Sequence, residues 1–368
     1  MVFVKFMPFD IHKLILTLVI PIEIYCIAHL YKRNQVMKPV KIAVVGAGRI
    51  GKMHIENIIQ HVPQIQIKTV VDAVDQSVWV RSMNIAGFTQ NLSDVLNDPE
   101  IEAVLIASST STHVDLIKQV AEARKHIYCE KPIAFSPEAL KNIASLVKQN
   151  EIKLQVGYNR RFDPQYLEVK KNVSKGAIGE PHIVKLTNRD PERPDLAFVP
   201  NSGGLFFDFN AHDFDMVRYV TGLEVEEVYA MGDVLIDPEL KKLNDIDTAA
   251  ITLRLSNRAV CMIDTSRETH YGYDQRLEVF GSKGSIKANN TSPLNTELYT
   301  KEGVSSHNPH YSFIERYEHS YVQQFKEFHM AIVEDTEPLV TINDALRAVE
   351  IATAAKLSLE ENRPVRVG

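Results

Sequence analysis

Cysteine and tryptophan are scarce in this chain, which has three cysteines and one tryptophan among 368 residues. Cys26, Cys129 and Cys261 are widely separated and form no C-x-x-C or Cys/His spacing. This excludes a disulfide framework and a zinc-ligand motif. Free thiols of this kind suit a reducing compartment, so we expect a cytoplasmic protein.

A basic stripe with interleaved aromatic residues is also missing, and the formal net charge is -6. Proteins that bind nucleic acids carry such a stripe, so we expect no nucleic-acid partner. The chain contains neither an internal repeat nor a low-complexity linker. Its length suits two globular domains, each with its own core.

One apolar run, Leu14 to Tyr31, is long enough to be considered as a membrane helix. Pro21 and Glu23 interrupt it near the middle, where a carboxylate is costly. No small-x-small cleavage site follows it, which argues against a secretory signal. We therefore expect residues 1–36 to be an N-terminal extension outside the fold, without a membrane partner. A membrane-tethered form is the alternative.

A glycine motif follows directly after the first apolar strand, Lys41–Val45. The motif is G-x-G-x-x-G, and a helix-like stretch comes after it. The first glycine permits a tight turn, the second lets a pyrophosphate approach the backbone, and the third lets the helix pack closely on the strand. The positive end of the helix would face the phosphates. The predicted dinucleotide cradle consists of Gly46, Gly48, Arg49, Ile50 and Gly51.

Asp72 ends a second strand, Ile65–Val71, at a distance of ~20 residues past the glycine motif. A carboxylate there accepts hydrogen bonds from the hydroxyls of the adenosine ribose and repels a 2′-phosphate. Ala73 follows, without an adjacent arginine or lysine to neutralise that phosphate. We therefore predict NAD rather than NADP as the cofactor. A turn or capping role for Asp72 is the alternative.

The remaining pattern changes along the chain. Alternating strands and helices up to Gly157 favour a parallel sheet covered on both faces, and Ser136 and Pro137 form a helix start. Short alternating runs then favour an antiparallel sheet, closed by helices over 312–334 and 342–361. We predict a doubly wound α/β Rossmann domain over residues 37–157 and an α+β domain with a large, mainly antiparallel open sheet over 158–368. A ligand should bind between them.

Glu130-Lys131-Pro132 directly follows a strand, His126–Cys129, whose carboxyl end should border the nicotinamide. A lysine there can donate to a substrate hydroxyl and lower the pKa of that alcohol. Pro132 would fix the turn that aims it. A lysine exposed in a surface loop is the alternative.

Asp208 and His212 stand four residues apart, a spacing that places both on one face of a helix. Oxidation of a secondary alcohol requires loss of the hydroxyl proton, and an imidazole has a suitable pKa to accept it. A carboxylate one turn away could fix the imidazole's tautomer. The alternatives are a solvated Asp/His pair and a metal site with Asp215, but no further ligand joins these residues and we predict no metal.

Adjacent arginines, Arg160 and Arg161, stand beside aromatic residues in the segment Tyr158–Pro164. Guanidinium groups could anchor substrate hydroxyls there or could bind the fold together. The sequence leaves these two interpretations open.

Taken with the glycine motif, these segments resemble the glucose-fructose oxidoreductase / inositol dehydrogenase / rhizopine-catabolism (Gfo/Idh/MocA) superfamily over about residues 37–368, and within it the inositol 2-dehydrogenases. The resemblance implies a catalytic triad of Lys131, Asp208 and His212. It implies further substrate contacts from Arg161, Asn188, Asp190 and Tyr271. It also implies cofactor contacts from Ser108, Thr110, His113, Glu130 and Lys131.

The implied activity is NAD-dependent oxidation of a cyclic polyol, myo-inositol to 2-keto-myo-inositol (scyllo-inosose), in inositol catabolism, by a homotetramer built on the open sheet faces. Asn188-Arg189-Asp190 departs from the His-Arg-Asn found in many inositol enzymes of the family. A scyllo-inositol, sugar or deoxy-sugar dehydrogenase therefore remains an alternative. A non-catalytic NAD-sensing regulator is another, although it would need no proton acceptor.

Overall fold

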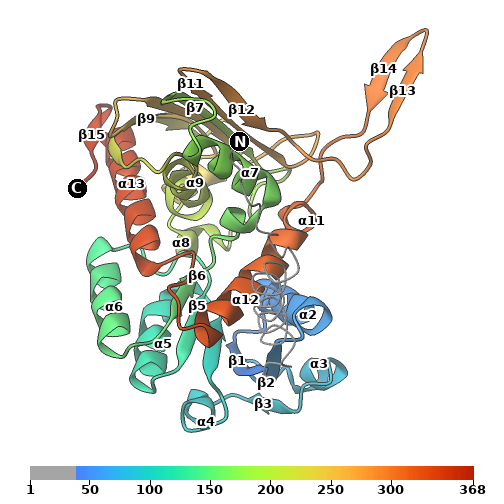
Figure 1. Cartoon of the computed structure of the whole chain (residues 1–368), viewed down its shortest axis with the longest axis vertical. Coiled ribbons are helices and arrows are strands. Elements are labelled where there is room, and N and C mark those ends of the chain that lie inside the picture. Colours follow the sequence, from blue (N-terminus) through green and yellow to red (C-terminus); the bar gives the residue numbers. More distant parts are fainter. Residues whose placement is uncertain (1–38) are drawn as a thin grey trace, which may run out of the picture. The chain divides into compact units, whose positions relative to one another are not determined.

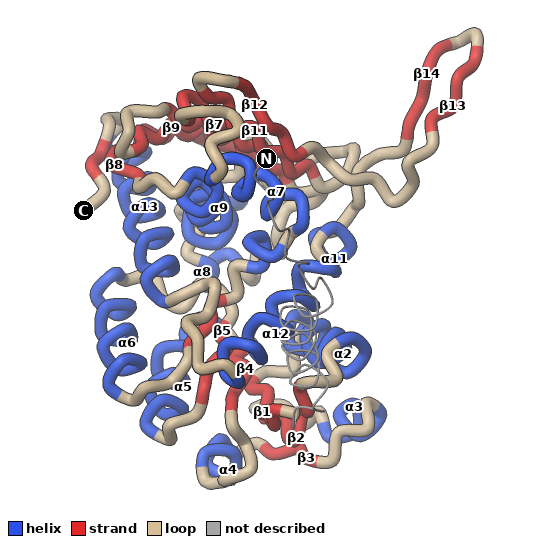
Figure 2. The backbone as a smooth tube through the Cα atoms, in the orientation of Figure 1, coloured by secondary structure: helices blue, strands red, loops and turns tan. Residues whose placement is uncertain are grey.

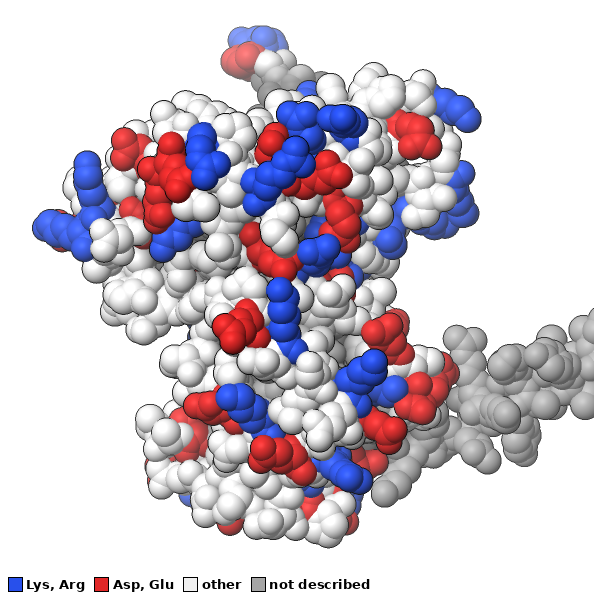
Figure 3. All heavy atoms as spheres, turned by 90° about the vertical axis from the view of Figure 1, so that its left-hand side faces the viewer, with Lys and Arg blue, Asp and Glu red and all other residues white. Residues whose placement is uncertain are grey.

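The computed structural model describes residues 39–368 (Figure 1). The predicted extension 1–36, with the apolar run Leu14 to Tyr31 and Cys26, lies outside these residues. Within the part that is described, no helix is both long and apolar enough to cross a membrane. On the face drawn in Figure 3, acidic and basic side chains are interspersed.

The first domain is built on a six-stranded sheet in the order β3-β2-β1-β4-β5-β6. All neighbouring strands are parallel. The strands are β1 (Val40–Val45), β2 (Ile65–Val71), β3 (Gly87–Thr89), β4 (Ala103–Ile106), β5 (His126–Cys129) and β6 (Leu154–Val156). The chain reverses its direction of travel across the sheet between β1 and β4, and ligands bind beyond the carboxyl ends of strands at such a point. The predicted Rossmann fold is confirmed.

Helices cover both faces of this sheet because residues of β1 alternate between two cores. Ile42 and Val44 pack with α2 (Arg49–His61), while Ala43 and Val45 belong to the core that includes α5 (Thr110–Glu122) and α6 (Pro137–Gln149). Two short helices complete the domain, α3 (Ser77–Ser82) and α4 (Leu92–Leu96).

One helix from the C-terminal part of the chain, α12 (Glu318–Val333), also packs on this first domain. Its residues Val322, Phe325 and Phe328 join the core beside α2. The first domain's core therefore includes a segment far beyond residue 157, the boundary that the sequence suggested.

The second domain contains a seven-stranded sheet in the order β12-β11-β7-β10-β9-β8-β15 (Figure 2). Its strands are β7 (Pro181–Arg189), β8 (Val225–Asp233), β9 (Thr248–Leu255), β10 (Val260–Ser266), β11 (Asp274–Gly281), β12 (Gly284–Ala288) and β15 (Val365–Arg366). Only the β7/β10 pair is parallel, so the predicted mainly antiparallel sheet is confirmed. This one parallel pair brings the carboxyl ends of β7 and β10 to the same edge.

Helices α7 (Pro164–Ser174), α9 (Ala211–Thr221) and α13 (Ile342–Glu361) pack against one face of this sheet (Figures 1 and 2). On the strands, Ile183, Val260 and Phe280 are exposed neighbours. The remaining elements are η1 (Asn159–Phe162), α8 (Val199–Ser202), η2 (Leu205–Phe209), α10 (Glu239–Lys242), α11 (Phe313–Arg316) and the projecting hairpin β13 (Glu297–Thr300) with β14 (Gly303–Ser306).

Local signals account for several helix ends. Ser136 caps α6 by accepting a hydrogen bond from the backbone N–H of Ala139, as its position before a proline predicts. Thr341 and Asp344 form a capping box that starts α13. The single helix expected over 312–334 is wrong, because the chain breaks at Tyr317 into α11 and α12.

Candidate active site

The surroundings of the three motif glycines are compatible with the roles that the sequence predicted for them. At Gly46, with φ +96°, a Cβ would lie 2.7 Å from the backbone nitrogen of Ser108, and at Gly51 it would lie 1.9 Å from the carbonyl oxygen of Gly46. A Cβ on Gly48 would have no atom within 4 Å. The first and third glycines therefore let the chain pack on itself, and the second leaves open space at the start of α2.

The start of α2 fits the pyrophosphate of NAD. No side chain caps its first turn, and no acidic residue lies there. Its free backbone N–H groups and the positive helix end therefore remain for an anion. Arg49, the first residue of the helix, is exposed and its guanidinium lies 5.5 Å from the centre of the Phe313 ring.

The different surroundings of Gly51 and Gly48 give a matched pair of variants. Gly51→Ala should destabilise the protein by about 1–3 kcal/mol or more through overpacking, which thermal unfolding would measure. Gly48→Ala should leave the melting temperature near that of the wild type and weaken NAD binding, because its methyl group occupies the space left for the phosphates. Equal melting temperatures for the two variants would contradict these roles.

Asp72 lies at the glycine loop, as the ribose prediction requires. Its Oδ2 accepts a hydrogen bond from the N–H of Ala47 at 2.6 Å, and its Oδ1 accepts one from Val74 at 2.9 Å. The carboxylate is half-buried, and each oxygen keeps a lone pair for a ribose hydroxyl. Asp72 also has the alternative turn role, since its hydrogen bond from Val74 closes a local turn.

Asp72→Ala should weaken NAD binding about 10- to 100-fold, because hydrogen bonds to a charged group are lost. The same variant should narrow the preference for NAD over NADP, because the charge that repels a 2′-phosphate is gone. Asp75→Ala is a matched control, since this nearby carboxylate accepts a hydrogen bond from the backbone N–H of Ser77 and not from the glycine loop. Titration of both nucleotides onto each variant measures the effect, and unchanged NAD affinity in Asp72→Ala would place the ribose elsewhere.

The predicted cofactor contacts after β4 divide into two kinds. Ser108 and Thr110 are half-buried at the start of α5. His113 is 1% exposed, and its ring nitrogens lie 2.9 Å from the carbonyl oxygen of Pro132 and 3.1 Å from that of Ser108. Both ring nitrogens of His113 therefore face backbone carbonyl oxygens of the loops after β4 and β5, and the neutral ring donates to one of them.

Glu130 is also engaged within the protein. Its Oε1 lies 2.6 Å from Nε2 of His54 in α2, and its Oε2 accepts the N–H of Lys131 at 3.2 Å. Burial raises the pKa of Glu130, but the hydrogen bond from His54 and the charge of Lys131 more than offset this and the pKa is lowered. Glu130 thus links the cofactor helix to the loop that carries Lys131.

The structure brings Lys131 and Asp208 together across the junction of the two domains. Nζ of Lys131 donates to the carbonyl oxygen of Asp208 at 2.9 Å and to its Oδ1 at 3.1 Å. Lys131 follows β5 and precedes a cis peptide bond to Pro132, while Asp208 belongs to η2. The two domains therefore meet at this pair.

Asp208 and His212 do not share one helix, so that prediction is wrong. Asp208 lies in the π-helical turn η2, and α9 begins only at Ala211. Among the residues described, Asp208 bonds to Lys131 and Arg267 but not to His212. The ring of His212 instead packs edge-on against Tyr158, with centroids 5.7 Å apart. An aromatic contact, rather than a carboxylate, orients the imidazole.

The charge states of His212 and Asp208 suit proton transfer. Burial lowers the pKa of His212 well below its usual value, and Arg160 and Lys131 lower it further. The imidazole is therefore neutral near neutral pH and can accept a proton. Burial raises the pKa of Asp208, but Lys131 and Arg267 outweigh this and lower it, so Asp208 is ionised.

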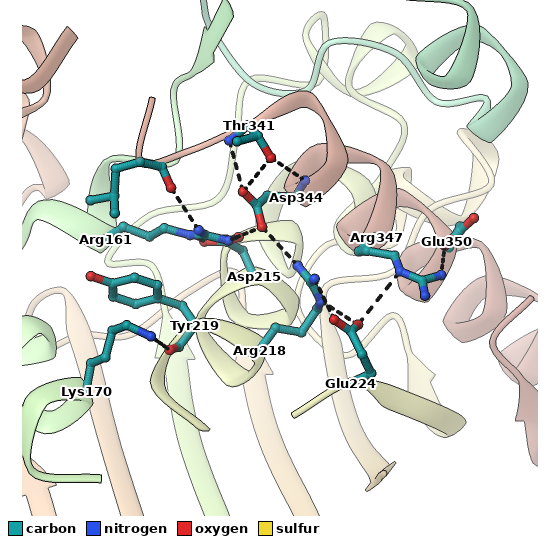
Figure 4. A network of polar contacts seen from close by, with 11 residues as sticks. Arg161, Lys170, Asp215, Arg218, Tyr219, Glu224, Thr341, Asp344, Arg347 and Glu350 are labelled. Atoms are coloured by element: carbon teal, nitrogen blue, oxygen red, sulfur yellow. Dashed lines mark hydrogen bonds and ion pairs between the residues drawn. The ribbon is translucent and has the colours of Figure 1, made fainter. Parts of the chain in front are cut away.

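Arg161 lies in a different network, drawn in Figure 4. Its guanidinium binds Asp215 at 2.6 Å and Asp344 at 2.8 Å, and it donates to the carbonyl oxygen of Leu339. These contacts occupy the group, so Arg161 binds the fold together and we do not carry it into the proposed substrate site. Asp215 is engaged here too. No three metal-binding side chains cluster within residues 39–368.

Asn188 is likewise engaged in a buried network. It is fully buried, and its amide donates to Asp213 at 2.7 Å and accepts from Arg160 and Gln275. Arg160 binds the other oxygen of Asp213 at 3.0 Å. Asn188 and Arg160 therefore stabilise the second domain through Asp213.

Asp190 and Tyr271 have different surroundings. Burial raises the pKa of Asp190 to about 7, and the charged groups that act on it are Arg267, Asp208, Arg160 and Lys131. Asp190 therefore belongs to the same cluster as Lys131. Tyr271 is 40% exposed and donates to Asp274 at 2.6 Å, which leaves its ring accessible.

The fold and the cluster define a class of protein, an NAD-dependent oxidoreductase in which a Rossmann domain carries the lysine and a second domain carries the aspartate and the histidine. Residues 40–158 match the family described as "Oxidoreductase family, NAD-binding Rossmann fold", and residues 170–367 match "Oxidoreductase family, C-terminal alpha/beta domain". The chain belongs to the Gfo/Idh/MocA oxidoreductase family.

Individual relatives agree with this assignment. The chain is 46% identical to an uncharacterised oxidoreductase of Bacillus subtilis over 90% of this chain and 97% of that protein. It is 39% identical to a myo-inositol 2-dehydrogenase of Thermotoga maritima over 89% and 98% of the two chains. The structure of scyllo-inositol dehydrogenase from Lactobacillus casei with NAD(H) and scyllo-inositol has a TM-score of 0.84 at 28% identity, covering 90% of this chain and 99% of that one.

Proposed function

We propose that this enzyme oxidises one ring hydroxyl of an inositol to the ketone with NAD as acceptor, and that myo-inositol, giving 2-keto-myo-inositol (scyllo-inosose), is the preferred substrate. The observation that carries the proposal is the ion pair between Lys131 of the Rossmann domain and Asp208 of the second domain, with a neutral His212 four residues on. The similarity to inositol 2-dehydrogenases supports the substrate class.

Three side chains have separate roles at the reacting hydroxyl of the substrate. His212 accepts the hydroxyl proton, because its imidazole is neutral and half-buried. The ammonium of Lys131 donates to the same oxygen and stabilises the charge that develops there. Asp208 holds Lys131 in place. NAD, when bound, supplies the hydride acceptor, and Gly46–Gly51 with Asp72 would hold it.

The substrate contacts proposed beyond this triad are Asp190 and Tyr271. Asp190 shares its surroundings with Lys131 and Asp208. A carboxyl group whose pKa is about 7 can donate or accept a hydrogen bond to a ring hydroxyl near neutral pH. It stands where many inositol enzymes of the family have asparagine, and we propose that it contributes to the choice between inositol isomers.

A substrate panel tests the function. The purified chain is mixed with NAD or NADP and with myo-inositol, scyllo-inositol, aldoses and deoxy-sugars, and absorbance of the reduced cofactor is followed. We expect the highest kcat/KM with myo-inositol and NAD. Turnover confined to scyllo-inositol or to a sugar would select the alternative dehydrogenases.

NAD binding without turnover of any compound in the panel would instead favour the sensing regulator. The His212→Ala variant serves as the reference for slow turnover, because it should bind NAD and turn over about 100- to 10,000-fold more slowly. Light scattering in the same samples measures the assembly. We propose that the protein is cytoplasmic and acts in inositol catabolism. We also propose that it is a homotetramer, in which the exposed sheet face around Ile183, Val260 and Phe280 forms the subunit contact. A monomer in solution would contradict the proposed tetramer.

A further inference from the structure

Arg267 is the residue directly after β10. Because β10 pairs in parallel with β7, Arg267 lies at the same edge of the sheet as the residues that follow β7. Ser266 pairs with Arg189 at the ends of these two strands, and the N–H of Asp190 donates to the carbonyl oxygen of Ser266 at 3.0 Å. Asp190 and Arg267 therefore leave the same edge of the sheet together. The sheet therefore places the carboxyl group of Asp190 and the guanidinium of Arg267 near Asp208.

The carboxylate of Asp208 has a cation on each oxygen. Oδ1 accepts from Nζ of Lys131 at 3.1 Å, and Oδ2 accepts from Nη1 of Arg267 at 3.3 Å. Arg267 is only 1% exposed, whereas the side chains of Lys131 and Asp208 are 18% and 17% exposed. Lys131 is thus on the accessible side of Asp208, and Arg267 lies behind it.

The rest of the guanidinium is held within the second domain. Nη2 lies 3.7 Å from Oδ2 of Asp245, whose Oδ1 accepts the N–H of Leu205 at the start of η2. Phe209, at the end of η2, has its ring centre 5.5 Å from the guanidinium carbon. Arg267 and Asp245 therefore brace both ends of the turn that carries Asp208.

Two guanidinium atoms of Arg267, Nε and Nη2, are buried and make no hydrogen bond with any residue in the described part of the chain. The well-directed contact of this group is the one to Asp208. Because Arg267 is almost fully buried, it can act on the site through Asp208.

We propose that Arg267 is a positioning residue for the oxidation, an inference that rests on the function proposed above. From behind, it keeps the Asp208 carboxylate charged and turned so that Oδ1 holds Lys131 at the alcohol. Without Arg267, Lys131 would have to oppose the effect of burial by itself and the pKa of Asp208 would rise. A neutral carboxyl group is a poor anchor for an ammonium ion.

The direct test is the pH profile of kcat/KM in Arg267→Gln. The charged groups that face Asp208 are Lys131, Arg267 and Asp190. Loss of the arginine raises the pKa of Asp208, so we expect the acid limb to move up by about one pH unit or more, with a lower kcat and a nearly unchanged affinity for NAD. Arg267→Lys, which keeps the charge, should restore most of the acid limb.

Arg316→Gln is the matched control, because Arg316 is another buried arginine, paired with Asp163 at 2.6 Å. Both glutamine variants should lower the melting temperature, but only Arg267→Gln should move the acid limb. Turnover with a wild-type acid limb in Arg267→Gln would overturn the inference and leave the proposed function standing.

A double-mutant cycle gives a readout that does not need turnover. In Arg267→Gln, Asp208→Asn and the double variant, the unfolding equilibrium constants should depart from additivity by about tenfold, because the two side chains interact directly. Additive effects would overturn the inference. If wild-type protein oxidises nothing in the panel, the proposed function fails, while this cycle still shows whether Arg267 holds Asp208.

Discussion

Replacing His212 by alanine is expected to lower kcat about 100- to 10,000-fold, the range for loss of a general base. The physical reason is that Asp208, the other basic side chain of the triad, is ionised and held by two cations. Affinity for NAD should stay near the wild-type value, because His212 belongs to the second domain. Steady-state kinetics with the preferred inositol and NAD titration measure the two quantities.

His329→Ala provides the control for removal of a histidine. His329 is 1% exposed in α12, away from the Lys131–Asp208 pair, so its variant should lose stability without a comparable loss of kcat. Equal kcat in His212→Ala and wild-type protein would remove His212 from the role of base.

Replacing Lys131 by methionine should lower kcat about 100- to 1,000-fold, as removal of one donor to a developing oxyanion does. Methionine keeps the length and the apolar stem, so the loss reports on the ammonium group. Loss of the Lys131 charge should also raise the pKa of Asp208, although Arg267 still binds its Oδ2. KM should change less than kcat, since the charge on the oxygen develops only as the reaction proceeds.

Lys131→Arg separates charge from geometry. It keeps the positive charge but presents a planar fork in place of a compact ammonium, and we expect it to restore only part of the lost rate. Lys141→Met is a surface control, because Lys141 is 62% exposed and lies on α6. A Lys131→Met enzyme with wild-type kcat would show that the alcohol oxygen is stabilised by another group.

The cofactor half of the site could be predicted from sequence because its signals are local. A buried strand, three glycines and a helix are contiguous, and the steric tests at Gly46, Gly48 and Gly51 follow from backbone geometry within one turn. Asp72 comes from the next strand, whose parallel pairing with β1 brings it to the loop. A Rossmann fold and an NAD site follow from these adjacent elements alone.

The half of the site that the second domain contributes depends on contacts that cannot be predicted from the spacing of residues in the sequence. A spacing of four predicts one helix face for Asp208 and His212, but η2 is wound as a π-helical turn that ends before α9. Arg161 shows the same limit, since its partner Asp344 lies far along the chain in α13. Long-range ion pairs of this kind are not visible in a single sequence.

Arg267 was missed for a related reason. It stands alone after a strand, and its role follows only from the parallel pairing of β10 with β7 in an otherwise antiparallel sheet. A usable signal did exist, because two strands that end in Arg189-Asp190 and Ser266-Arg267 carry charged residues at comparable positions. Recognising it would have required the register of the sheet.

The central claim is that Lys131, Asp208 and His212 act together on one ring hydroxyl of an inositol. Its most direct test uses myo-inositol with deuterium on the ring carbon that bears the reacting hydroxyl, together with NAD and the wild-type enzyme. We predict that the reduced cofactor carries one deuterium in its mass spectrum and that His212→Ala forms this labelled cofactor at least about 100-fold more slowly. Reduced cofactor without the label, or none from any inositol, would contradict the claim.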